Sequence, residues 1–230
     1  MPGPWSRTAT DGSGQGVQGL GVTVTWSVAG DGTPVPGVGG SLNQPSDMRA
    51  WLAGLYGGSA SGPAEEQPWF PLFEECFDQL SAQCGVRFVY EPNDDGRSFI
   101  GTLSGAGEIG TRGDIRIGGR PLDGPSGTLA FAYAPNYGEV ILDTDDSYFD
   151  VLSSNSIRLL NVLTHELGHA MGLDHVCPIN RTKLMEPFLS SAFRGTRFDE
   201  WQSLQRQYGD PLEVEGTIRD NDSAETARDL

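Results

Sequence analysis

Basic residues are scarce in this sequence. Its 230 residues include 15 Lys and Arg against 31 Asp and Glu, which gives a formal net charge of −16 at pH 7. Such a surface repels nucleic acids and anionic membranes. The sequence also lacks any run of about 18 apolar residues, the length of a membrane-spanning helix, and its first residues show no leader pattern. We therefore expect neither nucleic acid nor a membrane among its partners.

Cysteine is scarce as well. Cys76, Cys84 and Cys177 are too few for a disulfide scaffold, and one of them is left over if a single bridge forms. Cys76 and Cys84 fall in and at the end of an expected helix. Cys177 follows a cluster of histidines, so two interpretations stay open for it: a thiolate ligand of a metal, or a buried or bridged cysteine. We favour the second.

The apolar pattern predicts a sheet with helices packed on it. Alternating β-branched stretches bounded by Gly and Pro predict strands, and apolar residues three and four apart predict amphipathic helices. The expected strands are 22–28, 86–90, 114–117, 128–133 and 139–142, and the expected helices are 48–56, 69–83, 157–171 and 199–208. Residues 154–156 should cap the third helix. This combination is typical of an α/β or α+β domain.

The two ends of the chain differ in composition from the middle. Residues 1–20 are rich in Gly, Ser and Thr, which predicts an irregular lead-in and a main domain over 21–212. Residues 213–230 contain no aromatic side chain and few apolar ones. They predict a linker or the start of a truncated module.

All three histidines of the chain lie within eleven residues, at His165, His169 and His175. The first two are one helical turn apart, so both imidazoles can hold one Zn²⁺ while Glu166 sits beside the metal. Gly172 can adopt the positive φ that ends a helix and turns the chain back, which brings His175 to the same ion. Three neutral histidines leave a fourth zinc position open for water, as in catalytic sites.

The alternative is that these histidines bind nothing. A single histidine on a helix is more often a surface or core residue, and an HExxH string occurs by chance in unrelated proteins. Here the pattern is longer and takes up every histidine of the chain. It therefore favours a zinc centre.

Residues 165–175, HELGHAMGLDH, resemble the HExxHxxGxxH signature of the metzincin clan, and the Gly-Leu-Asp-His ending is similar to that of the matrixins. Residues 183–187, KLMEP, resemble the matrixin Met-turn. The resemblance implies that Met185 lies beneath the zinc and that Pro187 belongs to the wall of the S1′ pocket. It also implies an α+β, zincin-like fold, with a twisted mixed five-stranded sheet, two long helices, an active-site helix, the Met-turn and a small C-terminal helical subdomain.

Further segments resemble the same family. They are 114–117 (its third strand), 123–130 (DGPSGTLA, its DGPGGxLA segment), 142–149 (LDTDDSYF, its FDxDExW segment) and 199–209 (its closing helix). The strand at 128–133 resembles the family's edge strand above the cleft, which implies substrate contacts at Leu129 and Ala130. Residues 220–227 are similar to the opening of modules that follow bacterial secreted proteases.

The resemblance also carries expectations about metals. Asp123, Asp143 and Asp146, with carbonyl groups near 124–127, are implied as ligands of a structural Ca²⁺. The alternative is that these carboxylates belong to a solvated acidic surface. The histidines that a second, structural zinc needs are absent, so we expect one zinc per chain. No segment similar to the family's PRCGxPD is present, so this span encodes no cysteine-switch latency.

Together these residues predict a zinc-dependent endopeptidase that is secreted or extracellular, monomeric and active on extended polypeptides. Glu166 is the expected general base, which takes a proton from a zinc-activated water and delivers it to the leaving amine. An apolar P1′ side chain should be preferred. The alternative is a catalytically inactive, metal-stabilised binding module on the same fold, and the presence of Glu166 favours the enzyme.

Overall fold

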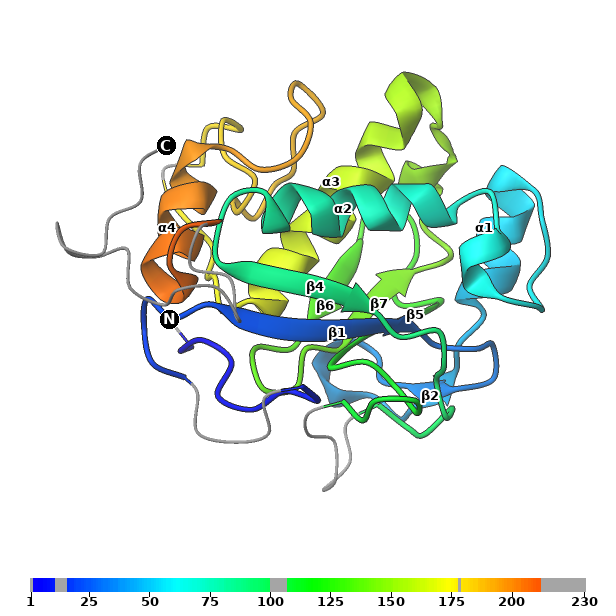
Figure 1. The fold of residues 1–230 in the computed structure, drawn as a ribbon. Helices are drawn as coiled ribbons and strands as arrows, with labels where there is room; N and C mark the ends of the chain where they lie inside the picture. The colour runs from blue at the N-terminus through cyan, green and yellow to red at the C-terminus, as the bar shows by residue number, and fades with distance from the viewer. Residues whose placement is uncertain (1, 11–15, 100–106, 178, 212–230) are drawn as a thin grey trace, which may run out of the picture.

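A computed structural model describes residues 2–10, 16–99, 107–177 and 179–211 (Figure 1). Its main layer is a five-stranded sheet with the strand order β4-β1-β5-β7-β6. The strands are β1 (Val22–Val28), β4 (Val86–Tyr90), β5 (Ile115–Arg120), β6 (Ala130–Ala132) and β7 (Val140–Asp143). β6 is antiparallel to β7, whereas the other neighbours are parallel. β6 therefore forms one edge of a mixed sheet.

Helices and short elements complete the fold. The helices are α1 (Met48–Tyr56), α2 (Phe70–Ser81), α3 (Ser153–Ala170) and α4 (Phe198–Tyr208). The short elements are the strand pair β2 (Pro34–Val35) and β3 (Gln44–Pro45), and the 3-10 turns η1 (Val38–Gly40), η2 (Ala64–Glu66) and η3 (Ser147–Asp150). None of the described helices combines the length and hydropathy that a bilayer crossing needs.

The core lies between the sheet and the helices α2 and α3, which run side by side in Figure 1 and contact each other. Trp26 of β1 stacks on Phe70 and Phe77 of α2, with ring centroids 5.4 and 4.2 Å apart. The spacing of these apolar residues turns one face of α2 to the sheet. Helix α3 packs beside α2 and against β6 and β7. The α+β fold with its five-stranded mixed sheet, predicted from the sequence, is confirmed.

The start of α3 differs from the expectation. No side chain caps it, and Ser154, Asn155 and Ser156 have φ values of 55°, 52° and 54°. They form a left-handed turn, and the right-handed helix begins at Ile157. The prediction that these residues cap the helix is therefore wrong. Their backbone carbonyls serve another purpose, because Arg194 donates to the carbonyl oxygen of Asn155 at 2.9 Å.

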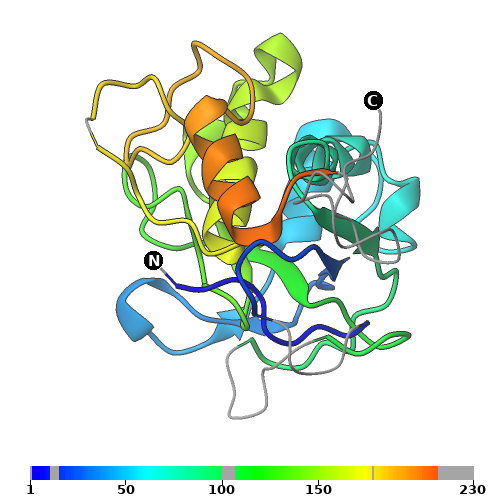
Figure 2. The same cartoon turned by 60° about the vertical axis from the view of Figure 1, so that its left-hand side comes forward.

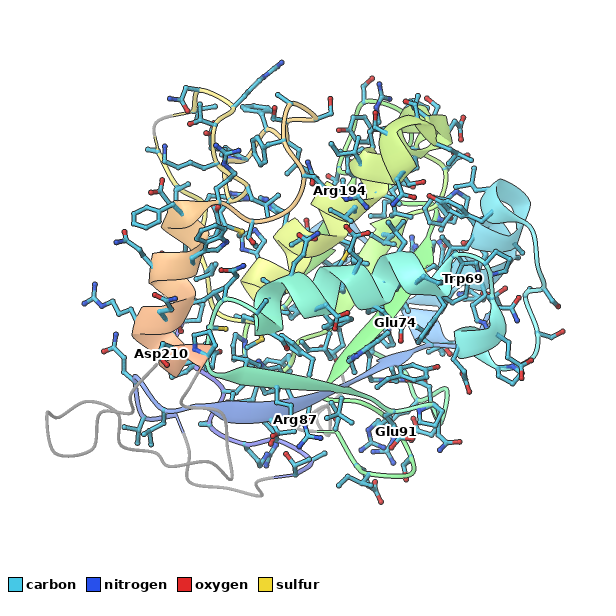
Figure 3. All side chains as sticks on the ribbon, turned by 45° about the horizontal axis from the view of Figure 1, so that its top comes forward. Trp69, Glu74, Arg87, Glu91, Arg194 and Asp210 are labelled. Atoms are coloured by element: carbon cyan, nitrogen blue, oxygen red, sulfur yellow. The ribbon has the colours of Figure 1, made fainter. Side chains whose placement is uncertain are left out.

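Arg194 also ties the loop before α4 to α2. Its Nη2 lies 2.6 Å from Glu75 Oε2 and its Nε lies 2.7 Å from Glu75 Oε1, a two-pronged ion pair. Figure 3 shows Arg194 above the two long helices. On α3, Asn161 binds the same loop, donating to the carbonyls of Ser190 and Phe193 at 2.7 and 2.8 Å. The loop is thereby held against the active-site helix.

Part of the N-terminal segment belongs to the core, although its described residues, 2–10 and 16–20, form no helix or strand. Trp5 is 1% exposed, and its indole Nε1–H donates to the carbonyl of Ala170 at 3.0 Å. Its backbone N–H donates to the hydroxyl of Tyr208 at 3.3 Å. In Figure 2 this segment passes the foot of α4. The predicted linker or module at 213–230 lies outside the described residues.

Candidate active site

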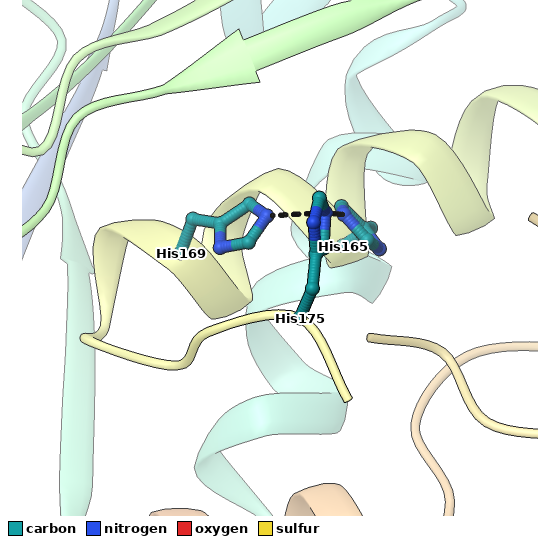
Figure 4. Close-up of side chains that lie close together, drawn as sticks. All are labelled: His165, His169 and His175. Atoms are coloured by element: carbon teal, nitrogen blue, oxygen red, sulfur yellow. Dashed lines mark hydrogen bonds between the residues drawn. The ribbon is translucent and has the colours of Figure 1, made fainter. Parts of the chain in front are cut away.

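Helix α3 and the turn after it bring the three histidines together. His165 and His169 are one turn apart on α3, so their imidazoles share a face. Gly172, with φ +88°, reverses the chain just beyond the helix in a conformation that favours glycine. The returning segment places His175 next to the other two rings (Figure 4). The three predicted zinc ligands thus meet at one point.

The spacing of their nitrogens suits zinc. His175 Nε2 lies 3.1 Å from His165 Nε2 and 3.2 Å from His169 Nε2. Tetrahedral zinc with Zn–N bonds of about 2.0 to 2.1 Å sets ligand nitrogens about 3.3 Å apart. Within the described ranges, these residues are the one group of three or more His, Cys, Asp or Glu side chains close enough to share a metal.

In His165 and His169, a hydrogen bond at Nδ1 determines which ring nitrogen is free to bind a metal. His165 Nδ1 lies 2.7 Å from the carbonyl oxygen of Leu184, and His169 Nδ1 lies 2.7 Å from that of Leu173. A carbonyl only accepts, so each Nδ1 carries the proton and each Nε2 presents a lone pair. The residues present therefore fit a divalent metal.

Burial keeps these imidazoles neutral. It lowers the pKa of His165 to about 3, and the neighbouring His169 adds to the shift. Burial lowers the pKa of His169 as well. Neutral imidazole is the form that binds metal, so both side chains are ready to bind near neutral pH.

Glu166 lies beside the cluster in an apolar setting. It is 5% exposed, and its Oε2 has no hydrogen-bond partner among the described residues. Burial raises the pKa of this carboxyl to about 8. A buried carboxylate oxygen without a partner is costly unless a ligand satisfies it. Glu166 follows His165 directly in α3 and lines the same cavities as the histidines, so it fits a role towards a metal and its bound water.

Met185 lies against α3 at Gly168, and its place beneath a zinc ion stays a prediction. A Cβ atom at Gly168 would lie 2.5 Å from Met185 Sδ, so a larger residue at this position between the two helical histidines would require the Met185 side chain to move. Two backbone hydrogen bonds hold the turn. Val176 N–H donates to Met185 O at 2.9 Å, and Met185 N–H donates to Glu200 Oε1 at 3.2 Å.

Glu186 has a structural role that the sequence interpretation missed. Its carboxylate is fully buried and accepts the backbone N–H groups of 180–183, at 2.5 to 3.0 Å. Burial opposes its ionisation, but these donors outweigh burial and lower its pKa to about 2. An acidic residue within the otherwise apolar stretch 184–188 was the signal for a buried, partnered carboxylate.

Two hollows flank the histidines beneath β6. The first, of about 420 Å³, is lined by Gly127, Thr128, Leu129, Ala130, Tyr148, Val162, His165, Glu166, His175, Arg181, Pro187, Phe188 and Leu189. The second, of about 300 Å³, is lined by Pro2, Ala130, Phe131, Ala132, Ala134, Glu166, His169, Leu173, Asp174 and His175. The predicted substrate contacts Leu129, Ala130 and Pro187 all line the first hollow. Glu166 lines both.

The three aspartates predicted to bind calcium make other contacts. Asp143 accepts backbone N–H groups from Leu122, Asp123, Gly124 and Asp145, at 2.9 to 3.4 Å. Asp146 accepts from the N–H groups of Ser126 and Tyr148, at 3.0 and 2.7 Å, and Asp123 accepts from Thr128. These bonds fasten the segment 122–128 to the end of β7. Calcium binding stays a prediction, and these contacts lend it no support.

The cysteines form no bridge. Cys76 and Cys84 are buried and free, and burial raises the pKa of each thiol to about 12. Cys177 is free and exposed, so the favoured expectation that it is buried or bridged is wrong. Cys177 is exposed because the described residues of the loop beyond His175 lie on the surface. Cys177 also lies outside the group of histidines that can share a metal.

Comparisons with known proteins agree with this geometry. The sequence model of the matrixin family matches residues 73–209, which is more than half of the chain. Stromelysin-1 of Rattus norvegicus is 37% identical over 100 residues, which cover 40% of this chain and 20% of that protein. Karilysin of Tannerella forsythia is 31% identical over 115 residues, 47% of this chain and 23% of karilysin.

A plant protein is also similar to this chain. Metalloendoproteinase 2-MMP of Arabidopsis thaliana is 30% identical over 135 residues, which cover 50% of this chain and 35% of that protein. The chain spans between 17% and 35% of the length of the curated relatives it matches. The similarity therefore concerns one part of these longer proteins.

Proposed function

Since this chain belongs to the matrixin family, we propose that it is a secreted, zinc-dependent endopeptidase that hydrolyses extended polypeptides beneath β6. The observation that carries the proposal is the convergence of three histidine Nε2 atoms in a cleft that the buried, unpartnered carboxyl group of Glu166 also lines. A metal-binding group and an adjacent proton acceptor are the two elements that metal-assisted hydrolysis requires.

Each residue has a defined task in this proposal. The Nε2 atoms of His165, His169 and His175 hold Zn²⁺, which, when bound, acidifies a coordinated water and polarises the substrate carbonyl. Glu166 accepts a proton from the attacking water and delivers it to the nitrogen of the leaving amine. Burial raises the pKa of Glu166 to about 8, and a bound divalent cation would favour its ionised form, which is the form that accepts a proton.

The sheet edge supplies the binding surface. β6 pairs with β7 on one side, and an extended peptide can add to its other side as a further strand. The backbone at Leu129 and Ala130 then aligns the scissile bond over the histidines. Val162 and Pro187 give the first hollow apolar walls, which favour an apolar side chain at P1′.

The rival function is an inactive, metal-stabilised binding module. It needs neither a buried carboxylate without a partner nor open hollows on both sides of the histidines. Both features are expected of an enzyme that must hold a water and a peptide together.

The decisive experiment is hydrolysis of a quenched fluorescent peptide by Glu166→Gln. We expect kcat/KM to fall by about 10²- to 10⁴-fold, the usual contribution of general acid–base catalysis, while bound zinc is retained. Glu66→Gln, at an exposed position, is the matched control and should behave as wild type. Undiminished hydrolysis by Glu166→Gln would refute the role of Glu166, and a zinc-loaded wild type that cleaves no peptide in a diverse library would favour the binding module.

A further inference from the structure

We propose that Arg181 gives this cleft a preference for substrates that carry an acidic side chain shortly after the scissile bond. This inference rests on the proposed endopeptidase function and names a class of substrate for it. The preferred peptide carries Asp or Glu at P2′ or P3′, so that its carboxylate meets the guanidinium of Arg181.

The charges of the first hollow lead to this inference. Among the described residues that line it, Arg181 is the one permanent cation and Glu166 the one carboxylate. Arg181 has no ion-pair partner in the part of the chain that the structure describes. Arg181 is an exposed residue, so its guanidinium is accessible to a substrate side chain. Its planar fork matches a carboxylate better than a lysine does.

The backbone fixes Arg181 at this position. Its N–H group is one of the four that converge on the buried carboxylate of Glu186. The φ of Arg181 is +63°, a left-handed conformation that is uncommon for a residue with a Cβ and that is typical of such anion-binding turns. The Glu186 carboxylate therefore holds the backbone from which the Arg181 side chain extends to the hollow.

The second hollow has the opposite character. Its described lining residues include the carboxyl groups of Glu166 and Asp174 but neither lysine nor arginine. The cleft is therefore electrically asymmetric along β6. An acidic substrate residue is attracted on the side of Arg181 and repelled on the side of Asp174, which gives the acidic preference a direction along the peptide.

The test compares peptides that differ only by Glu, Gln or Lys at P2′ or P3′ and keep an apolar residue at P1′. For the zinc-loaded wild type we expect kcat/KM to favour Glu over Gln about fivefold at one or more of these positions, as for a partly exposed ion pair. Arg181→Gln should bring this ratio to about one, and Arg181→Glu should reverse it in favour of Lys. Lys183→Gln is the matched control: it removes a charge from the same loop but does not line the hollow, so the Glu preference should remain.

A binding measurement separates this proposal from the proposed function. Fluorescence anisotropy with Glu166→Gln should show the same Glu preference in Kd, and the double variant with Arg181→Gln should lose it. If no peptide is cleaved but this binding preference is present, the endopeptidase proposal fails and the role of Arg181 stands. Equal kcat/KM and Kd for Glu and Gln at both positions, or a preference that survives Arg181→Gln, would overturn the role of Arg181.

Discussion

Two clusters of three ionisable side chains lie near the cleft. They differ in whether their lone pairs are free for a metal or already accept hydrogen bonds from the chain. In the histidine cluster (His165, His169 and His175), hydrogen bonds hold the far nitrogens of two rings, and the near nitrogens converge. In the aspartate cluster (Asp123, Asp143 and Asp146), the carboxylate oxygens accept N–H or hydroxyl groups of the chain itself. The first cluster is ready for a metal, whereas the second holds a loop. A residue type alone therefore does not make a ligand.

Among the substitutions that test this comparison, Asp143→Asn should have the largest effect on the free energy of unfolding. Asp143 is fully buried and accepts four backbone N–H groups, and an amide would turn NH₂ towards some of these donors. We expect the free energy of unfolding to fall by about 3 kcal/mol, as measured by urea denaturation. Asp150→Asn, at an exposed position, should change it by less than about 0.5 kcal/mol. A wild-type midpoint for Asp143→Asn would contradict the loop-holding role.

The histidine cluster should show itself in the pH dependence of the metal-free protein. His165, with its pKa lowered to about 3, is neutral when folded but protonates below about 6.5 when unfolded, so acidification below 6.5 favours unfolding. Glu166, with its pKa raised to about 8, stays protonated when folded but ionises when unfolded, so stability falls as the pH rises towards 8.

Between pH 6.5 and 8, His165 is neutral in both the folded and the unfolded state, so of these two groups only Glu166 changes the free energy of unfolding. We expect the free energy of unfolding to drop by about 2 kcal/mol over this window, at about 1.4 kcal/mol per unit. Urea titrations of wild type and Glu166→Gln with a chelator present should differ in this slope, with the variant flatter. Parallel curves for the two proteins would show that Glu166 is not buried as a neutral acid.

A smaller effect is expected where Met185 contacts α3 at Gly168. Gly168→Ala would push a methyl group against Met185, and this overpacking should cost about 1 to 3 kcal/mol, offset by about 1 kcal/mol of helix propensity. The net loss is then about 1 kcal/mol in thermal or urea denaturation. Gly54→Ala in α1, whose new Cβ meets nothing within 4 Å, is the control and should stabilise slightly. Equal gains at both positions would mean that Met185 does not press on α3.

The addition of calcium should have the smallest effect on thermal stability. The sequence-based prediction is a rise of Tm on calcium addition, about 2.7 kcal/mol of stability at a hundredfold excess over Kd. The hydrogen bonds of Asp143 and Asp146 lead instead to an unchanged Tm, because their oxygens already hold N–H groups. A calcium-dependent rise that Asp146→Asn removes would restore calcium to the aspartate cluster and break the comparison.

Much of the fold could be predicted because its signals are local. The alternation in 22–28 and the three-and-four spacing in 69–83 arise from the periods of strand and helix, and the structure has β1 and α2 there. The zinc ligands could be predicted for the same reason, since the spacing of His165 and His169 within one helix places them together.

Other features depend on contacts between distant segments or on backbone shape. Trp5 binds the carbonyl of Ala170 across most of the chain, and no periodic pattern reports such a contact. Glu186 accepts four backbone N–H groups from a turn in which Arg181 has a left-handed conformation, and no periodic pattern predicts such a turn. The left-handed turn at 154–156 was mistaken for a cap because Ser and Asn favour both. In each case the determining partner is set by tertiary structure.

The zinc content of three purified proteins tests the central claim most directly. Metal analysis after dialysis, under conditions where circular dichroism shows folded protein, should give one zinc per chain for wild type and for Asp143→Asn. His169→Ala should hold less than about a tenth of that amount, since two imidazoles bind zinc far more weakly than three. Zinc retained in full by His169→Ala, or two zincs per wild-type chain, would contradict the assignment of a single metal to the histidine cluster.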